Sequence, residues 1–222
     1  MKEVFAGYNN REGKARFITD HFEKNLKQAN SILDIGCDNN RFKSTHGSKV
    51  TGIDIAGSPD YIVNLEKEKL SHFPDNSFEL IICTDVLEHI DNFHAVLDDM
   101  FRVSRDKIII SLPNCGSFFR AMPIIFGRHS GKYYGLPLTP PEDRHKWFFT
   151  WREIRSFFHN YATKNKLDIE NEFLSYGYKS PLRRSILQTI SFILPVTTFA
   201  QSYWVVLTPN STSKNTPQTT NN

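Results

Sequence analysis

Short apolar segments alternate with helical patterns along the chain, and this alternation limits the possible folds more than any other feature. The expected strands cover residues 31–36, 49–54, 61–65, 78–83, 107–112, 167–176 and 202–207. Strands and helices that alternate at this spacing form crossover units and a mostly parallel sheet. The strands are apolar on both faces, as a sheet covered by helices on both sides requires. The sequence therefore predicts a doubly wound, Rossmann-like α/β fold.

Between these strands, apolar residues recur at helical intervals. In residues 12–30 they stand at Ile18, Phe22, Leu26 and Ala29, which predicts one continuous helix. A second helix is expected to begin after Asn92, and a third after Thr150, where Thr150 and Glu153 form a capping box. A fourth is expected from Ser180, with proline in its first turn.

The domain organisation follows from length and composition. A chain of 222 residues suits one sizeable domain, which we place at residues 1–208. Residues 113–149 are rich in glycine, proline, arginine and aromatic residues and have no clear period. They are expected to form either a lid or acceptor-binding insertion, or a variable surface loop. Residues 209–222 have almost nothing to bury and are predicted to be a disordered tail.

Composition argues against several classes of protein. The formal charge is only +3 without a dense basic stripe, so no nucleic-acid partner is expected. The N-terminus has no signal-peptide pattern, and the apolar region 186–200 is too interrupted to span a bilayer. The three scattered cysteines indicate reduced thiols and a cytoplasmic location. The cysteines are too far apart in the sequence to be metal ligands, and the five-residue spacing of His89 and His94 does not suit a shared ion. No metal site is therefore expected.

Acidic residues close three of the expected strands. Asp34 and Gly36 end the first, Asp54 ends the second, and Asp85 follows the fourth. Ligands of open α/β sheets bind beyond the carboxyl ends of the strands, and a carboxylate about twenty residues after the glycine turn can accept both hydroxyls of a ribose. The strand ends therefore predict a site for a cofactor that contains a nucleoside.

The glycine turn discriminates between cofactors. A dinucleotide site needs the pattern G-x-G-x-x-G, whereas this chain has Gly36, Asp38 and Arg41 at those positions. Asp38 would place a negative charge beside a diphosphate, which disfavours NAD and nucleotide-sugar enzymes. S-adenosylmethionine carries no phosphate, so acidic residues suit it better.

Three blocks of the chain, residues 31–38, 52–54 and 73–90, resemble the class I S-adenosylmethionine-dependent methyltransferases, and the type 11 branch in particular. The resemblance covers roughly residues 30–113. It implies a seven-stranded sheet in the order 3-2-1-4-5-7-6, in which residues 202–207 form the antiparallel strand. Glycines that are usual in this family are replaced by Asp38 and Asn40, and Asn40 tolerates a positive φ.

The resemblance also implies roles for individual residues. Asp34 and the turn at Gly36 and Cys37 would hold the methionine part, Asp54 the ribose, and Ile55, Asn64 and Leu65 the adenine. Asp85, Val86 and His89 would line the floor near the methyl group. Each residue also has a purely structural interpretation, such as a loop cap at Asp34 or Asp54 and a packed histidine at His89.

The acceptor is less constrained. Transfer to oxygen needs a base, for which His145 is preferred over His129 and Asp143. Residues 133–149 are similar to methyltransferases of surface-polysaccharide biosynthesis, which favours a small-molecule, sugar or lipid-linked acceptor. Residues 142–149 are equally consistent with a salt-bridged surface turn. Peripheral membrane contact would involve Lys179, Arg183 and Arg184.

Two functions from different classes remain open. The first is a methyltransferase that transfers a methyl group to a small or glycan-like acceptor, at oxygen. The alternative is an inactive binding or regulatory protein of the same fold, in which Asp38 and Asn40 have weakened the cofactor site.

Overall fold

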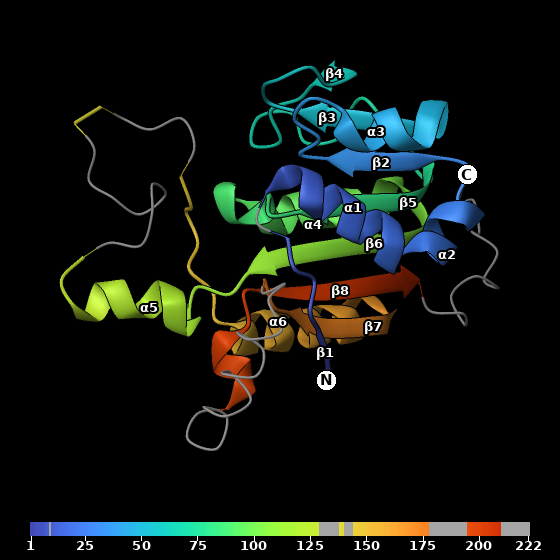
Figure 1. The fold of residues 1–222 in the computed structure, drawn as a ribbon. Helices are drawn as coiled ribbons and strands as arrows, with labels where there is room; N and C mark the ends of the chain where they lie inside the picture. The colour runs from blue at the N-terminus through green and yellow to red at the C-terminus, as the bar shows by residue number, and fades with distance from the viewer. Residues whose placement is uncertain (9, 129–137, 140–143, 178–194, 210–222) are drawn as a thin grey trace.

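A computed structural model shows one mixed sheet with helices on both faces (Figure 1). The structure describes residues 1–8, 10–128, 138–139, 144–177 and 195–209. The strands, in chain order, are β1 (Lys2–Val4), β2 (Ile32–Ile35), β3 (Val50–Asp54), β4 (Tyr61–Ile62), β5 (Phe78–Thr84), β6 (Ser104–Pro113), β7 (Leu167–Ser175) and β8 (Ser202–Pro209).

The spatial order of these strands is β1-β7-β8-β6-β5-β2-β3-β4. Strand β8 runs antiparallel to both of its neighbours, β6 and β7, and the pairings from β6 to β4 are all parallel. This confirms the predicted doubly wound sheet and its order for seven strands. The eighth strand, β1, pairs in parallel with β7 at the sheet edge and was not predicted, because three mostly exposed residues have no readable period.

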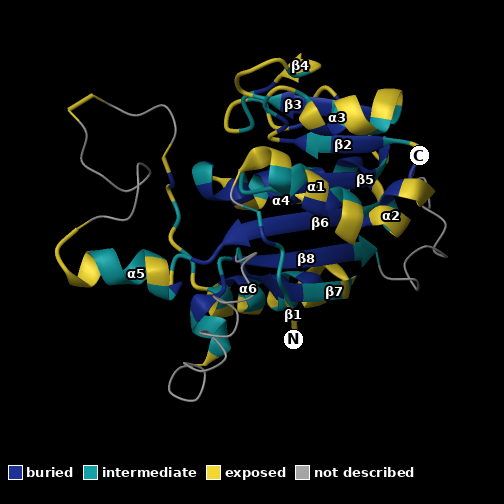
Figure 2. Ribbon diagram, viewed as in Figure 1, coloured by how far each residue is buried: buried dark blue, intermediate teal, exposed yellow. Residues whose placement is uncertain are grey.

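Helices α1 (Arg11–His21), α2 (Glu23–Gln28) and α3 (Arg41–His46) supply Phe17, Leu26 and Phe42 to the buried cluster on one face of the sheet. Helices α4 (Phe93–Val103) and α6 (Trp151–Asn165) pack on the other face. Short 3-10 turns include η1 (Gly47–Lys49), η2 (Leu87–His89) and η4 (Val196–Phe199). Figure 2 shows the central strands buried between these two layers.

Two helix predictions need correction. The single helix expected over residues 12–30 is two helices, because the backbone of Phe22 leaves the helical region at φ −110° and ψ 23°. The ring of Phe22 is buried against Phe173 and Trp204. The helices predicted after Asn92 and Thr150 are confirmed: Asn92 caps Ala95, and both bonds of the capping box at Thr150 are formed.

Two other segments also differ from expectation. Within the segment predicted to be irregular, residues Phe118–Ile125 form helix α5, which projects away from the sheet (Figure 1). The third expected strand shrinks to the two residues of β4, after which the N–H of Val63 bonds to the carbonyl of Asp54 and the ladder ends.

Several predictions lie outside the described residues. They are the helix from Ser180, the cations at Lys179, Arg183 and Arg184, the tail beyond Pro209, and the alternative bases His129 and Asp143. Among the helices that the structure describes, none is long and apolar enough to cross a membrane.

Candidate functional site

Three adjacent strands bring their acidic ends to one edge of the sheet. In the parallel register, Asp34 of β2 stands beside Gly52 of β3 and Ile82 of β5. Asp54 and Asp85 therefore follow on either side of the Gly36 turn. This edge is where ligands of doubly wound sheets bind, and the shared location that the sequence predicted for these residues is present.

The turn after β2 requires glycine. Gly36 has φ +81°, and a Cβ at this position would lie 2.4 Å from Cγ2 of Val86. Gly36 and Cys37 both donate their backbone N–H to the carbonyl of Ile53, at 2.9 and 3.2 Å. Val86 thus packs directly on the glycine turn, and any larger residue at Gly36 would clash with it.

Asp38 and Asn40, which replace the usual glycines, adopt the left-handed conformation with φ 55° and 53°. The turn therefore keeps its shape, as expected for Asn40. The side chain of Asn40 lies so close to Gly52 that a Cβ there would be 1.9 Å from its Oδ1. Cys37 is buried behind the turn, and burial raises the pKa of its thiol to about 12. The thiol therefore stays protonated, and Cys37 serves as a small packed residue.

Asp54 organises the loop around it. Its Oδ2 accepts the backbone N–H of Asp38 at 2.8 Å, and its Oδ1 accepts those of Ile55 and Ala56 at 2.7 and 3.3 Å. The loop-capping interpretation of Asp54 is therefore present in the structure. Each carboxylate oxygen has two lone-pair directions, so capping still leaves acceptor capacity for a ligand hydroxyl.

The residues expected around the adenine flank this loop. Ile55 is 63% exposed, so its side chain is open to a ligand at this edge. The segment with Asn64 and Leu65 is tied to the end of β3 by the bond from Val63 N–H to the carbonyl of Asp54 at 2.9 Å. Leu65 packs against the core, whereas Asn64 Oδ1 accepts the N–H of Glu66.

The carboxyl of Asp34 is held in an unfavourable environment. Burial raises its pKa to about 7; the nearby Asp54 contributes in the same direction and Lys14 opposes it. A cation beside Asp34 would restore its ionised form. The ammonium group of a bound amino acid would supply that charge.

Lys14 of α1 crosses to the same edge, and sequence reasoning missed it. Its Nζ donates to Oδ2 of Asp85 at 2.7 Å, while Ser111 donates to Oδ1 at 3.1 Å. Although burial raises the pKa of Asp85, these partners lower it overall. One signal was available, because Lys14 stands four residues before Ile18 on the apolar stripe of its helix.

Sequence analysis also missed a second positively charged residue of helix α1. Arg11 lies 2.6 Å from the carboxylate of Asp38 and is largely exposed. The pair ties the start of α1 to the loop after β2. Sequence spacing carried no signal for this contact, because the two residues are joined only by tertiary packing.

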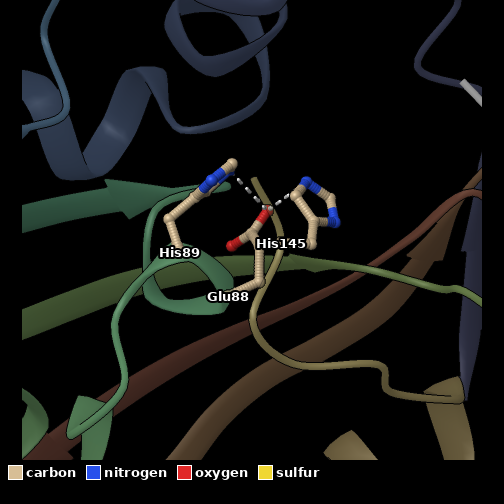
Figure 3. A group of neighbouring side chains, drawn as sticks. All are labelled: Glu88, His89 and His145. Atoms are coloured by element: carbon tan, nitrogen blue, oxygen red, sulfur yellow. Dashed lines mark ion pairs between the residues drawn. The ribbon is translucent and has the colours of Figure 1, made fainter. Parts of the chain in front are cut away.

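Beyond Val86, three side chains from two distant segments converge (Figure 3). Oε1 of Glu88 lies 3.9 Å from Nε2 of His89 and 3.8 Å from Nε2 of His145. Glu88 is fully buried, and burial followed by the charge of Asp85 raises its pKa well above the usual value. The rings of His89 and His145 lie with their centroids 4.5 Å apart. Sequence analysis did not single out Glu88, because a glutamate in this position looks like an ordinary helix-forming residue.

Backbone hydrogen bonds place His145 in this cluster. The carbonyl of Glu88 accepts the N–H groups of Lys146 and Trp147 at 2.8 and 3.2 Å. The indole of Trp147 donates to the carbonyl of Ile90 at 2.8 Å, and Lys146 forms ion pairs with Glu66 and Asp91. The end of the segment predicted as an insertion is thus fastened to η2, and His145 is 6% exposed.

The sheet order and the glycine turn at the carboxyl ends of the strands define a Rossmann-like α/β protein, a class that binds nucleoside-containing cofactors at this edge. The sequence profile of a methyltransferase domain family matches residues 7–165, so the chain belongs to this family of S-adenosylmethionine-dependent methyltransferases. Among curated protein sequences, none matches the chain.

Solved structures share this fold at low sequence identity. An S-adenosylmethionine-dependent methyltransferase from Archaeoglobus fulgidus is 18% identical, with a TM-score of 0.50 over 87% of this chain and 94% of that chain. The 1,6-didemethyltoxoflavin-N1-methyltransferase of Burkholderia thailandensis, with bound S-adenosylhomocysteine, is 12% identical (TM-score 0.55, 90% and 80% covered). A small RNA methyltransferase is 15% identical (TM-score 0.54, 94% and 27% covered).

The observed residues fit S-adenosylmethionine. The Gly36 turn is a cradle that a Cβ would fill. The carboxyl groups of Asp34, Asp54 and Asp85 suit an ammonium, a ribose and a sulfonium, and they would repel a diphosphate. The cofactor of this enzyme is therefore S-adenosylmethionine.

Proposed function

We propose that this methyltransferase transfers the methyl group of S-adenosylmethionine to an oxygen atom of a small-molecule or glycan-like acceptor. The observation that carries the proposal is the buried cluster of Glu88, His89 and His145 beside Val86, on the side of the site where the methyl group is expected. Groups able to accept a proton are needed for a hydroxyl acceptor and not for one that is already deprotonated.

In this proposal the cofactor supplies an activated methyl group when it is bound. Asp34 holds the ammonium, Asp54 the ribose, and Ile55, Asn64 and Leu65 the adenine. The turn at Gly36 and Cys37 supports the methionine part, while Asp85 and Val86 form the floor. His145, next to Glu88 at 3.8 Å, takes the proton of the acceptor hydroxyl.

Residues 113–149 are proposed to cover the acceptor. Helix α5 within this segment and the Phe126 that caps its end expose large apolar side chains, each at least half exposed: Phe119, Ile124, Ile125 and Phe126. Such a surface suits an acceptor with an apolar part, which supports a lipid-linked sugar or another amphipathic substrate.

The experiment is a transfer assay with S-adenosylmethionine labelled in the methyl group. The acceptor panel contains sugars, nucleotide sugars, lipid-linked sugars and phenols, with amines and short RNA as comparison. We expect label on a hydroxyl oxygen, located by mass spectrometry and NMR. Label only on nitrogen or carbon would contradict the oxygen proposal, and label on RNA would contradict the small-molecule acceptor. Cofactor binding without transfer to any acceptor would favour a regulatory role.

Calorimetry tests the cofactor residues separately. The variant Asp54→Asn keeps one capping oxygen but loses the charge, and we expect its affinity for S-adenosylmethionine to fall more than tenfold. Asp60→Asn, which changes a carboxylate outside the proposed site, is the matched control. Equal affinity in wild type and Asp54→Asn would show that the ribose contact is misplaced.

A further inference from the structure

The cluster of Glu88, His89 and His145 has an unusual polar imbalance. Glu88 is 0% exposed, and neither of its carboxylate oxygens has a hydrogen-bond partner among the described residues. Buried polar atoms in native proteins are almost always paired, and an unpaired one calls for an ion, a water or a functional role. Protonation of Glu88 alone does not solve the problem, because the O–H formed would also need a partner.

The tautomer of His89 places a further acceptor atom next to the Glu88 carboxylate. Its Nδ1 lies 3.1 Å from the backbone carbonyl of Arg144. A carbonyl oxygen only accepts, so Nδ1 carries the hydrogen and donates it. In the neutral ring, Nε2 then presents a lone pair, and this atom faces the Glu88 carboxylate at 3.9 Å. A cation placed between the Glu88 carboxylate and this ring nitrogen would be attracted by both groups.

We propose that Glu88, His89 and His145 bind one divalent transition-metal ion. The three ligand atoms lie within 4.8 Å of one another. Ligand atoms around tetrahedral zinc are separated by about 3.4 Å, given bond lengths of about 2.0–2.2 Å. The observed separations of 3.8 and 3.9 Å close to this value through small rotations of the two imidazole rings.

The surroundings match those of known metal ligands. A histidine that binds a metal usually donates its other ring N–H to a carbonyl or carboxylate, as His89 does to Arg144. The hydrogen bonds from Lys146 and Trp147 to the carbonyl of Glu88 hold the segment of His145 against η2. Backbone contacts thus orient the ring of His89 and hold the segment that carries His145 next to Glu88 before any ion arrives.

The donor set indicates the kind of ion. Two imidazoles and one carboxylate suit Zn²⁺, Co²⁺, Mn²⁺ or Fe²⁺ better than Ca²⁺, which prefers oxygen alone. Three protein ligands leave at least one coordination position open, as in catalytic zinc sites.

The location gives the ion a role that rests on the proposed oxygen transfer. An open coordination position next to Val86 would bind the acceptor hydroxyl and lower its pKa, so that its proton would pass to solvent water and the oxygen would be ready to take the methyl group. With the ion bound, His145 would be a metal ligand, and the role of proton acceptor proposed for it above would apply to the site without metal.

Metal binding by the full chain is the test. Protein stripped with a chelator is titrated with Zn²⁺ by calorimetry, and Co²⁺ is added separately to record its visible absorption. We expect one ion per chain, with imidazole-type Co²⁺ bands. His89→Ala and His145→Ala should each weaken binding at least tenfold, whereas His72→Ala, an exposed histidine outside the cluster, should leave it unchanged.

Glu88→Gln keeps the side-chain volume and separates folding from binding. We expect it to weaken Zn²⁺ binding while its circular dichroism matches that of the wild type. Absence of binding by the stripped wild type, or equal binding by wild type, His89→Ala and His145→Ala, would overturn the proposal. In that case, undiminished methyl transfer by stripped protein would leave the oxygen-transfer proposal intact. Stoichiometric binding without transfer would support the metal site and contradict the transfer proposal alone.

Discussion

Asp34 is a residue of this site whose buried carboxyl lowers the stability of the folded chain at high pH. Its carboxyl lies at the end of a buried strand, where burial raises its pKa to about 7. The folded chain therefore binds a proton more tightly than the unfolded chain does. Stability from this group is complete below the unfolded pKa near 4 and is lost as the pH rises through 7.

We expect Asp34→Asn to stabilise the cofactor-free protein at high pH. An amide cannot ionise, so at pH 8.5 the free energy of unfolding should rise by about 1–3 kcal/mol, a range reduced for the partial exposure of the group. The gain should shrink as the pH is lowered to 5, while affinity for S-adenosylmethionine falls. Urea unfolding at several pH values measures this, with the exposed Asp20→Asn as control. A gain that does not depend on pH would contradict the raised pKa.

Lys14 is the counterpart of these acidic residues, because its ammonium contacts Asp85 at 2.7 Å and lowers the pKa of Asp34. We expect Lys14→Met to lower the free energy of unfolding at pH 7 by about 1–2 kcal/mol, since Asp85 is left with less compensation. Lys24→Met, at an exposed position of α2, is the control and should change stability by less than about 0.5 kcal/mol. Similar losses in the two variants would show that the ion pair contributes little.

At the scale of elements, helix α6 links residues 113–149, the segment proposed to cover the acceptor, to the sheet. Its capping box at Thr150 begins immediately after the segment that carries His145 and Trp147. The carbonyl of Phe149 accepts the N–H of Cys115 at 2.7 Å, so both ends of the segment between residues 115 and 149 meet at this helix start. The cap therefore helps to position the cluster as well as the helix.

We expect Thr150→Ala to destabilise the protein by about 0.5–2 kcal/mol, because the first turn loses a side-chain acceptor. Thr163→Ala, near the exposed end of the same helix, removes a hydroxyl whose bond among the described residues is to the carbonyl of His159, one turn earlier. Its effect should stay within about 0.5 kcal/mol. Thermal and urea unfolding compare the two variants. An equal loss of unfolding free energy in both would show that the cap does not stabilise the helix.

At the scale of the whole molecule, the layer formed by α1 and α2 is fastened to the sheet by aromatic packing. Trp204 of β8 is fully buried, and its ring centroid lies 5.3 Å from that of Phe17, 5.9 Å from Phe22 and 5.8 Å from Phe173. Its indole N–H donates to Ser175 Oγ at 3.2 Å. This packing also carries Lys14 to the cofactor edge, since Lys14 belongs to α1.

We expect Trp204→Ala to cost about 3–5 kcal/mol in unfolding free energy, through lost burial and an internal cavity. Ile62→Ala, on the exposed edge strand β4, should cost less than about 1 kcal/mol, because little burial is lost. Chemical denaturation measures both. A loss at Trp204 no larger than at Ile62 would mean that this layer does not depend on the tryptophan.

The sequence by itself determined the alternation of strands and helices, the strand order of seven strands and the edge where Asp34, Asp54 and Asp85 meet. The alternation and the shared edge follow from local periodicity, from the glycine turn and from the rule that parallel strands end together. The order of the seven strands was implied by the resemblance of residues 30–113 to the class I methyltransferases. The kink at Phe22, the edge strand β1 and the helix α5 were missed, because each depends on packing against distant parts of the chain or on a period too short to detect.

Only the tertiary structure decided which side chains complete the site. Lys14 comes from the first helix, and His145 lies 56 positions beyond His89 in the chain. Sequence spacing could test His89 only against a near neighbour such as His94, and it excluded that pair, since only residues three or four apart on a helix lie side by side. Contacts between residues far apart in sequence are set by how helices and loops pack on the sheet, and no local pattern encodes that geometry.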